Sequence, residues 1–234
     1  MEPILLYGFP SGSSMGLVAA LEWLGRPYRL CRVDMLGEMR EPSYGRINPR
    51  HETPVLITDA GEPLTETMAI ATWLEARDEE RRISFPPLSR EADRMHQLMA
   101  FINTGFTGAF SPLWAILEME DADPVVQTTL RDFGHRAVIE RHDKLEGMIG
   151  QRPFLVGERP SLADAILVGV ARWLDVHEVA DRERWPKLSA LRARLEGDPA
   201  VIHATRLENG EPSPGTGALL GHVPLAEVIE RFGR

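Results

Sequence analysis

Three serines, Ser11, Ser13 and Ser14, lie in a short Gly- and Pro-containing loop that ends where a helix pattern begins. A hydroxyl group that donates a hydrogen bond to sulfur stabilises a thiolate over a thiol. An ordinary thiol has a pKa of about 8.5, and each unit of lowering corresponds to roughly 1.4 kcal/mol, which one charge-assisted hydrogen bond can supply. The positive end of the helix favours the same anion. The alternative interpretation is that these serines only cap the helix.

A second set of polar groups lies at Glu66 and Thr67, where a strand pattern changes to a helix pattern. The first turn of a helix leaves backbone N–H groups unsatisfied, and these suit a carboxylate. Thr67 adds a hydroxyl donor, and Glu66 is an acceptor for an ammonium group. These residues predict a site for the amino-acid end of a small molecule.

The dipeptide Thr53-Pro54 precedes the short apolar segment Val55–Thr58. An X-Pro bond can be cis at modest cost, and a proline before a strand is typical of a fixed turn. We expect the backbone of Val55 to be open, so that an extended peptide could pair there as an added strand. A small peptide with a free amino-acid end would fit both surfaces. A plain β-hairpin followed by a helix is the alternative.

Short strands and two helices are expected to position these groups. The pattern predicts strands over residues 4–7, 28–33, 55–58 and 63–65, a helix that ends at Gly25, and a second helix that begins near Thr67. Residues 35–46 are expected to be irregular with a short helical turn. The order is therefore strand–helix–strand, then strand–strand–helix.

Beyond Pro86-Pro87 the hydrophobic period is helical throughout. We expect a first domain over residues 1–82, a linker over 83–88, a helical domain over 89–207 and a C-terminal extension over 208–234. A long helix from about residue 95 is interrupted near Phe110–Trp114, and another opens at Asp123-Pro124. Ser161 and Asp164 match a capping box, and the apolar helix that follows is expected to be the buried axis of the domain.

The C-terminal extension is rich in Gly and Pro over residues 208–221, which predicts irregular structure, and a last short helix is expected over 223–232.

Composition excludes several classes of function. The chain has 234 residues and a formal net charge of −9, which argues against a nucleic-acid partner because such proteins need a basic face. Its single cysteine, Cys31, permits no internal disulfide and fits a reducing cytoplasmic setting. No signal peptide or membrane span is expected. His135 and His142 could share a helix face, but no third ligand accompanies them, so no metal site is expected.

The central segment carries a family resemblance. Asn48-Pro49, Thr53-Pro54-Val55-Leu56 and Leu64–Ile70 resemble the glutathione-binding half of a glutathione transferase. The resemblance implies a cis Pro54, a backbone pair from Val55 to the cysteinyl part of glutathione, and Glu66 and Thr67 on the γ-glutamyl end. It also places Glu52 near the glycyl carboxylate, which an acid would repel unless Arg50 or His51 compensates.

The serine loop is similar to bacterial transferases in the segment from Ser11 to Tyr28, read without a gap. That comparison implies that Ser11 is the thiolate-stabilising hydroxyl. A comparison with the beta class instead puts Ser13 where that class has its cysteine. Tyr7 lies close to the tyrosine of the alpha, mu and pi classes, but one position out of step, and its alternative role is a core strand residue. The order of preference is Ser11, Ser13, Tyr7.

In the second half, residues 101–114 resemble the beta-class segment that lines the pocket for the electrophile. Thr107 and Gly108 replace the His-Lys pair of that class. The implied pocket is apolar and lined by Phe106, Phe110 and Trp114, with core packing as the alternative. Residues 154–164 resemble the folding motif of transferase C-terminal domains.

The resemblance spans nearly all of residues 3–207 and implies a cytoplasmic, homodimeric glutathione transferase of detoxification. Its fold would be a thioredoxin-like α/β N-terminal domain followed by an all-α C-terminal domain. Glutathione would be the cosubstrate, a hydrophobic electrophilic small molecule the partner, and no metal, nucleic acid or membrane is expected. The alternatives are a glutathione-binding regulatory protein without catalysis, or a glutathione-dependent isomerase, dehalogenase or ether-cleaving enzyme.

Overall fold

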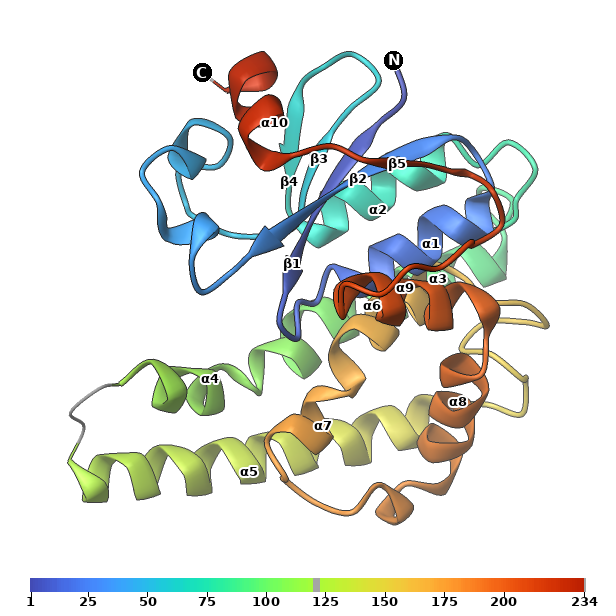
Figure 1. The fold of residues 1–234 in the computed structure, drawn as a ribbon. Coiled ribbons are helices and arrows are strands. Elements are labelled where there is room, and N and C mark those ends of the chain that lie inside the picture. The colour runs from blue at the N-terminus through green and yellow to red at the C-terminus, as the bar shows by residue number, and fades with distance from the viewer. Residues whose placement is uncertain (120–122, 234) are drawn as a thin grey trace.

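The computed structural model describes residues 1–119 and 123–233, which form a sheet-containing half and a helical half (Figure 1). The first half contains β1 Ile4–Phe9, α1 Met15–Leu24, β2 Tyr28–Asp34, β3 Val55–Ile57, β4 Pro63–Thr65 and α2 Thr67–Ala76, with short 3₁₀ turns η1 Glu38–Arg40 and η2 Tyr44–Arg46. The order and positions of these strands and helices confirm the sequence prediction.

The helical half begins at α3. Its elements are α3 Arg90–Phe101, the π-helical turn η3 Ile102–Phe106, α4 Ser111–Glu118, α5 Pro124–Met148, α6 Leu162–Ala171, α7 Trp173–Val176, η4 Arg182–Arg184, α8 Pro186–Glu196 and α9 Pro199–Glu208. The chain then returns to the first half through β5 Leu219–His222 and α10 Leu225–Phe232. Both termini consequently lie at the end of the molecule that is farthest from the helical half (Figure 1).

The sheet has five strands in the order β4-β3-β1-β2-β5. β1 pairs with β2 in parallel, while β3 is antiparallel to both β1 and β4. The fifth strand comes from the C-terminal extension and runs parallel to β2. The prediction that residues 208–221 are irregular is therefore wrong at its end, whereas the predicted last helix is confirmed as α10.

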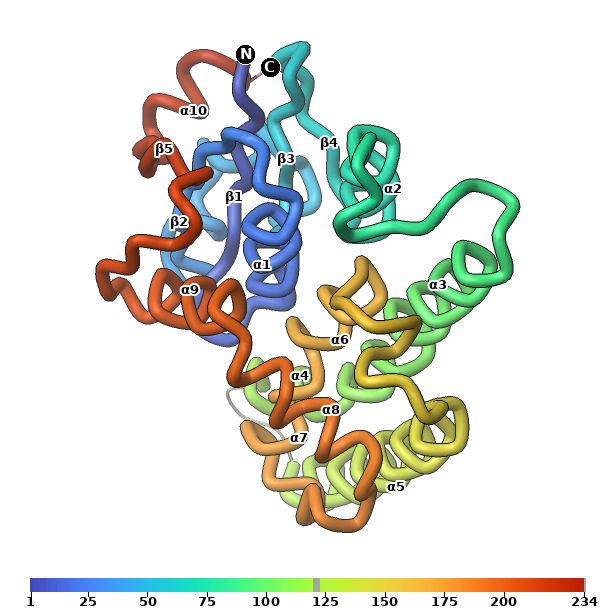
Figure 2. The backbone as a smooth tube through the Cα atoms, turned by 90° about the vertical axis from the view of Figure 1, so that its right-hand side faces the viewer, coloured from blue at the N-terminus to red at the C-terminus, as the bar shows by residue number. Residues whose placement is uncertain are grey.

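Each face of the sheet is covered by its own helices (Figure 2). Successive side chains of a strand point to opposite faces, so β1 contributes alternately to two clusters. Leu5 and Tyr7 pack with the residues of α1 and α2, whereas Ile4 and Leu6 pack with α10 through Val228 and related residues. The C-terminal extension therefore covers this face of the sheet together with Tyr44 and Ile47 of the segment after β2.

The helical half is organised around α6, all ten residues of which are buried. Asp164 caps the start of this helix as predicted: its carboxylate accepts hydrogen bonds from the backbone N–H and the hydroxyl of Ser161, at 2.9 and 2.7 Å. The predicted interruption is confirmed as the π-helical turn and the break before α4. Helices α4 and α5 then run side by side away from the sheet (Figure 1).

The two halves meet where α1 crosses α6, and the approach is close because two glycines face backbone there. A Cβ atom on Gly16 would lie 1.9 Å from the carbonyl oxygen of Ala165, and one on Gly169 would lie 2.1 Å from that of Ser13. Side chains at these positions would force the helices apart, so the crossing holds the start of α1, and the serine loop before it, against the helical half.

No helix in the described part of the chain is long and apolar enough to cross a membrane.

Candidate functional site

A small polar hollow of about 80 Å³ lies beside β4 and the start of α2. Five of the predicted binding residues line it: Glu52, Thr53, Pro54, Glu66 and Thr67. The other lining residues are Asn48, Arg50 and Thr65. The fold thus brings together two segments, around residues 50 and 66, that are joined in sequence only through the β3–β4 hairpin.

The N-terminus of α2 opens this hollow to an anion. Helix α2 begins at Thr67 without a side-chain cap, and its first intrahelical bond runs from the N–H of Ile70 to the carbonyl of Glu66. The N–H groups of Thr67, Met68 and Ala69 have no partner among the described residues. Three free donors at a positive helix end make a site for a carboxylate.

Thr53 presents the unpaired backbone in the hollow. The Thr53-Pro54 bond is cis, as the resemblance implied, and within the described ranges the N–H and C=O of Thr53 form no hydrogen bond. Val55 differs from the expectation. It is fully buried and paired on both sides, with Leu6 of β1 and Thr65 of β4. Its backbone therefore has no free edge, and the unpaired backbone groups belong to Thr53 instead.

The side chain of Arg50 crosses the hollow. From the sequence, Arg50 was expected only as a residue that could compensate for the negative charge of Glu52. Its guanidinium donates to the Thr65 hydroxyl at 2.7 Å and forms ion pairs with Glu66 at 2.9 Å and Glu52 at 3.2 Å. The side chain is half exposed, so these pairs are exchangeable. His51 does not join them, because its Nδ1 lies 2.8 Å from the carbonyl of Met39.

The backbone of Glu52 is fixed from the other side. Its carbonyl accepts hydrogen bonds from the hydroxyl of Tyr44 and the amide of Asn48, both at 2.9 Å. Tyr44 and Asn48 are buried, so this segment is anchored to the protein interior while the Glu52 carboxylate stays at the surface.

In the serine loop, Ser11 and Ser13 have free hydroxyl groups and Ser14 does not. Ser14 is fully buried, and its oxygen accepts the N–H of Gly8 at 2.9 Å. Ser11 and Ser13 are partly exposed, and neither hydroxyl has a partner in the part of the chain that the structure describes. None of the three serine side chains caps α1. The capping interpretation is therefore wrong for this loop, and two hydroxyl groups are available to a ligand.

The helical half holds the loop through its backbone. Trp173 donates from its indole nitrogen to the carbonyl of Ser11 at 2.9 Å. Arg172 donates to the carbonyl of Gly12 at 2.8 Å, and Glu208 accepts the N–H of Gly12 at 3.0 Å. Arg172 and Glu208 also pair directly, with side chains 21% and 4% exposed. This clamp fixes Ser11 in the left-handed region, with φ of 57°.

Tyr7 lies outside this arrangement, in agreement with its alternative role. It is fully buried, and its hydroxyl donates to the carbonyl of Leu207 and lies 3.1 Å from Nε2 of His222. Burial also raises its pKa. A buried, bonded hydroxyl cannot reach a ligand in the hollow. Cys31 is equally inaccessible, and burial raises the pKa of its thiol to about 12.

The expected apolar pocket is filled by packing. Phe106 and Phe110 are fully buried, and Phe106 lies with its ring centroid 4.4 Å from that of His142. Core packing therefore describes both: Phe106 ends the π-helical turn, Phe110 directly precedes α4, and both rings are fully buried. Trp114 is partly buried against His177, at 4.4 Å between ring centroids.

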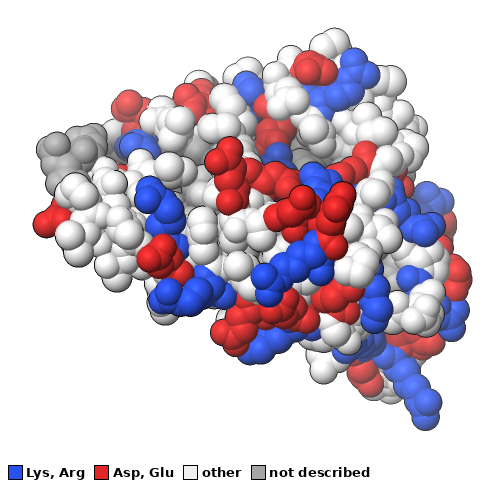
Figure 3. Space-filling model, turned by 90° about the horizontal axis from the view of Figure 1, so that it is seen from below, with Lys and Arg blue, Asp and Glu red and all other residues white. Residues whose placement is uncertain are grey.

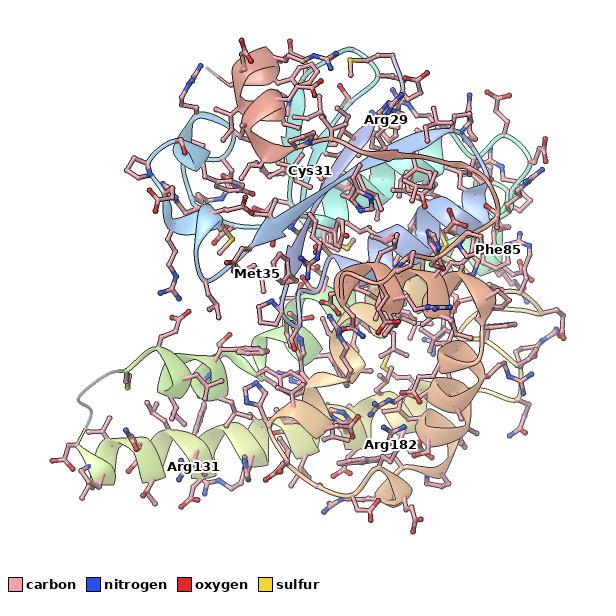
Figure 4. The ribbon with its side chains drawn as sticks, viewed as in Figure 1. Arg29, Cys31, Met35, Phe85, Arg131 and Arg182 are labelled. Carbon is pink, nitrogen blue, oxygen red and sulfur yellow. The ribbon has the colours of Figure 1, made fainter. Side chains whose placement is uncertain are left out.

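Met35, which the sequence did not single out, contacts Thr53, one of the residues that line the hollow. It follows β2 and lies toward the helical half (Figure 4). Its sulfur is 3.5 Å from the hydroxyl of Thr53. Its neighbour Leu36 is 65% exposed. Met35 therefore places an apolar side chain beside Thr53 without being part of the buried core.

The surface carries mixed charge. On the face shown in Figure 3, acidic and basic side chains lie interspersed. Within residues 1–119 and 123–233, no three His, Cys, Asp or Glu side chains form a group that could hold a metal ion.

Comparisons with known families match both halves of the chain. The family model described as "Glutathione S-transferase, N-terminal domain" matches residues 11–77. The model described as "Glutathione S-transferase, C-terminal domain" matches residues 129–199. Together the two matches span more than half of the chain, and the first contains the serine loop and the hollow.

Individual relatives agree. The chain is 26% identical to glutathione S-transferase GstA of Escherichia coli O157:H7 over 87% of this chain and 98% of that protein. It is 28% identical to a maleylacetoacetate isomerase of Pseudomonas aeruginosa, over 84% and 92%. Among solved structures, a glutathione transferase from Methylococcus capsulatus superposes with a TM-score of 0.72 at 28% identity, covering 88% of this chain and 98% of that one.

Proposed function

Because the chain belongs to the glutathione S-transferase family, we propose that it joins the thiolate of glutathione to an electrophilic carbon of a small apolar molecule. The thiol gives its proton to solvent, the sulfur forms a bond to carbon, and the leaving group departs with its electron pair. The protein is thus a transferase with glutathione as cosubstrate. The observation that carries this proposal is the set of unpartnered backbone groups of Thr53 and α2 around one polar hollow.

Each part of glutathione has a matching group in this hollow. The α-carboxylate of its γ-glutamyl end meets the three free N–H groups that begin at Thr67. The ammonium of the same residue meets the carboxylate of Glu66. The cysteinyl backbone pairs with the N–H and C=O of Thr53. The thiol then points toward the serine loop, where the free hydroxyl of Ser11 donates to the thiolate and Ser13 is the alternative donor.

Arg50 gives this site a feature of its own. Its guanidinium forms an ion pair with the Glu66 carboxylate, which is where the ammonium of glutathione would bind. Binding therefore exchanges one cation for another. The displaced Arg50 is then free to meet the glycyl carboxylate, which offsets the repulsion from Glu52. Arginine suits this role because its planar fork pairs well with carboxylates.

A second candidate is a glutathione-dependent isomerase, favoured by the similarity to a maleylacetoacetate isomerase. In that reaction the thiolate adds to a conjugated double bond, rotation follows, and the same thiolate leaves. Both functions use the same thiolate site and differ only in the acceptor. The side chain of Met35, which contacts Thr53 beside the hollow, would contact the acceptor in either case.

Two measurements test the proposal. Calorimetric titration with glutathione should give one site per chain, and an assay with 1-chloro-2,4-dinitrobenzene should show turnover. Turnover of a cis-configured conjugated diketo acid without net consumption of glutathione would select the isomerase. Glutathione binding without either reaction would make the protein a regulatory one, and absence of binding would overturn the proposal.

We also expect a homodimer, as is typical of the family. Exposed apolar side chains on α4 and α5 support this, since unburied side chains of this size mark contact surfaces. They are Leu117, Val125, Val126 and Phe133. Light scattering of the purified protein gives the test: a mass of one chain, 26.2 kDa, would contradict it.

A further inference from the structure

Arg32 of β2 is a partly buried cation that forms no ion pair with a carboxylate among the described residues. Its two side-chain hydrogen bonds go to one main-chain oxygen, the carbonyl of Glu208, from Nε at 3.2 Å and from Nη2 at 2.8 Å. Its guanidinium carbon also lies over the Phe9 ring, 3.3 Å from the ring centroid. Arg32 therefore neutralises no acid but links two segments that are far apart in the chain.

These two segments lie on either side of the serine loop. Phe9 ends β1 and precedes the loop, so the guanidinium over its ring holds the point where the loop begins. Glu208 ends α9, and its carboxylate accepts the N–H of Gly12 inside the loop at 3.0 Å. Arg32 thus acts on Ser11 from both directions, through Phe9 on one side and through Glu208 and Gly12 on the other.

The end of α9 is a favourable place for a cation. The last carbonyl groups of a helix have no intrahelical partner, and they form the negative end of the helix dipole. Arg32 binds the carbonyl of Glu208, and the hydroxyl of Tyr7 donates to the preceding carbonyl, that of Leu207, at 3.1 Å. Arg32 and Tyr7 are partners in the β1–β2 register. The sheet therefore fixes the end of α9, and this end presents the Glu208 carboxylate to the loop.

The two contacts of Arg32 require a planar cation. The face of a guanidinium stacks on an aromatic ring while N–H groups at its edge donate to an acceptor. The ammonium of lysine is a point charge on a flexible stem and has no face that could stack. Arg32→Lys would therefore keep the positive charge but lose the rigid link between Phe9 and Glu208.

We propose that Arg32 is a positioning residue for Ser11, a role that rests on the proposed transferase function. It holds the serine loop so that the Ser11 hydroxyl meets the sulfur of bound glutathione. Arg32 is not among the residues that line the glutathione hollow. Its loss should therefore impair activation of the thiol and leave binding of the rest of the tripeptide unchanged.

The test compares Arg32→Gln and Arg32→Lys with the matched control Arg29→Gln, all in the full chain. Arg29 lies on the same strand, at the end farther from the helical half (Figure 4), and its side chain has no hydrogen-bond or ion-pair partner among the described residues. Arg29→Gln removes the same charge as Arg32→Gln.

Four quantities are measured. Amide exchange of Gly12, followed by NMR without glutathione, reports the position of the loop. Thiolate absorbance gives the pKa of bound glutathione, and an aryl halide gives kcat. The dissociation constant of S-methylglutathione, which has no thiol, reports the hollow alone.

Both Arg32 variants should exchange the Gly12 amide at least tenfold faster and lower kcat at least tenfold. The pKa of the bound thiol should rise by about one unit. S-methylglutathione should bind within threefold of wild type, and Arg29→Gln should match wild type in all four measurements. Unchanged Gly12 exchange or an unchanged thiol pKa in Arg32→Gln would overturn the proposal. Full recovery of both in Arg32→Lys would also overturn it, because charge alone would then account for the effect.

A folding defect gives a different result. It lowers the number of S-methylglutathione sites per chain but does not move the pKa of the thiol in the sites that remain. If Arg32→Gln does not fold, Arg32→Lys decides, because it keeps a cation at the end of α9; wild-type exchange and thiol pKa in that variant would contradict the proposal. Failure of wild type to bind glutathione would count against the transferase function, whereas Gly12 exchange tests the action of Arg32 on the loop without any ligand.

Discussion

The carboxylate of Glu208 accepts a hydrogen bond from the backbone N–H of Gly12 at 3.0 Å, although the two residues are 196 positions apart in the chain. Glu208 ends α9, and Gly12 lies inside the serine loop. The loop that carries Ser11 is therefore positioned by the last helix of the helical half as well as by its own strand and helix. Arg172 completes the contact by binding both Glu208 and the Gly12 carbonyl.

Removal of this carboxylate should destabilise the protein and displace the loop. Glu208→Ala leaves Arg172 without its ion pair in a mostly buried place, and loss of one partner of such a pair costs about 3 kcal/mol. Glu208→Gln keeps an acceptor for Gly12 and should cost about half as much. Urea denaturation measures both, and the rate with an aryl halide should fall in the same order. Equal stability of wild type and Glu208→Ala would show that the clamp contributes nothing.

Replacement of Ser11 tests the thiolate donor. Ser11→Ala should lower kcat/KM by roughly 10- to 100-fold, because a hydrogen bond to a charged group contributes about 1.5–3 kcal/mol. The pKa of bound glutathione, read from thiolate absorbance, should rise by about one unit or more.

Ser13→Ala is the matched control and should stay within threefold of wild type. The reverse order of the two variants would assign the role to Ser13 and refute the preference for Ser11.

The Arg50 exchange predicts a difference between two ligands. Arg50→Ala should bind glutathione about tenfold more weakly, because the glycyl carboxylate loses its cation. It should bind γ-glutamylcysteine, which lacks the glycine, at least as well as wild type does, because Glu66 is then free for the ammonium. Titration calorimetry compares the two, with Arg50→Lys as the variant that keeps the charge. Parallel losses for both ligands would exclude the exchange.

Local patterns predicted most of the fold. Strand periodicity, the capping box at Ser161 and the helix start at Thr67 depend on neighbours in sequence, and the structure has them. The strand Leu219–His222 was missed because it follows a Gly- and Pro-rich segment and its partner β2 lies far away in the chain. Such long-range pairing leaves no local signal.

The candidate site was predictable in part for the same reason. The residues that converge on the hollow lie within one short segment, so their motif located them. Whether Thr53 or Val55 has the unpaired backbone depends on where β3 begins to pair with its neighbours. The spacing of residues in the sequence does not determine that position. Phe106 and Phe110 fit a pocket or a core equally well by composition, and the π-helical turn that ends at Phe106 has no sequence signature.

The buried His142 predicts a pH dependence of stability. Burial lowers its pKa from 6.5 to about 4, with the positive charge of Arg192 adding to the effect. The unfolded chain then binds more protons than the folded one between pH 4 and 6.5, so the free energy of unfolding falls as the pH drops through this window. The loss from this residue should be about 2 kcal/mol between pH 7.5 and 5.

His142→Phe should remove that loss, measured as the change in urea denaturation between the two pH values. Both proteins must be measured, because burial also raises the pKa of Asp164 to about 6. This second shift makes the free energy of unfolding rise as the pH drops from 6 to 3.8, opposite to the effect of His142. Identical pH dependence in the two proteins would mean that His142 does not become charged on unfolding.

Helix α10 should control access to Cys31, since both belong to the same buried cluster. Val228→Asp places a charge at a fully buried position of this helix, so the helix should detach and expose the thiol. Reaction with Ellman's reagent should then be at least tenfold faster. Ala226→Asp, at an exposed position of the same helix, should react as slowly as wild type; fast reaction of this control would contradict the prediction.

The return of the chain to its first half has a consequence for synthesis on the ribosome. Strand β1 leaves the exit tunnel long before β5 and α10, because residues 4–9 are translated before residues 219–232. The outer edge of β2 and the face of the sheet that α10 covers therefore wait for these partners until residues 219–232 have emerged. The sheet-containing half begins to form first, yet it is completed only after the helical half has been made.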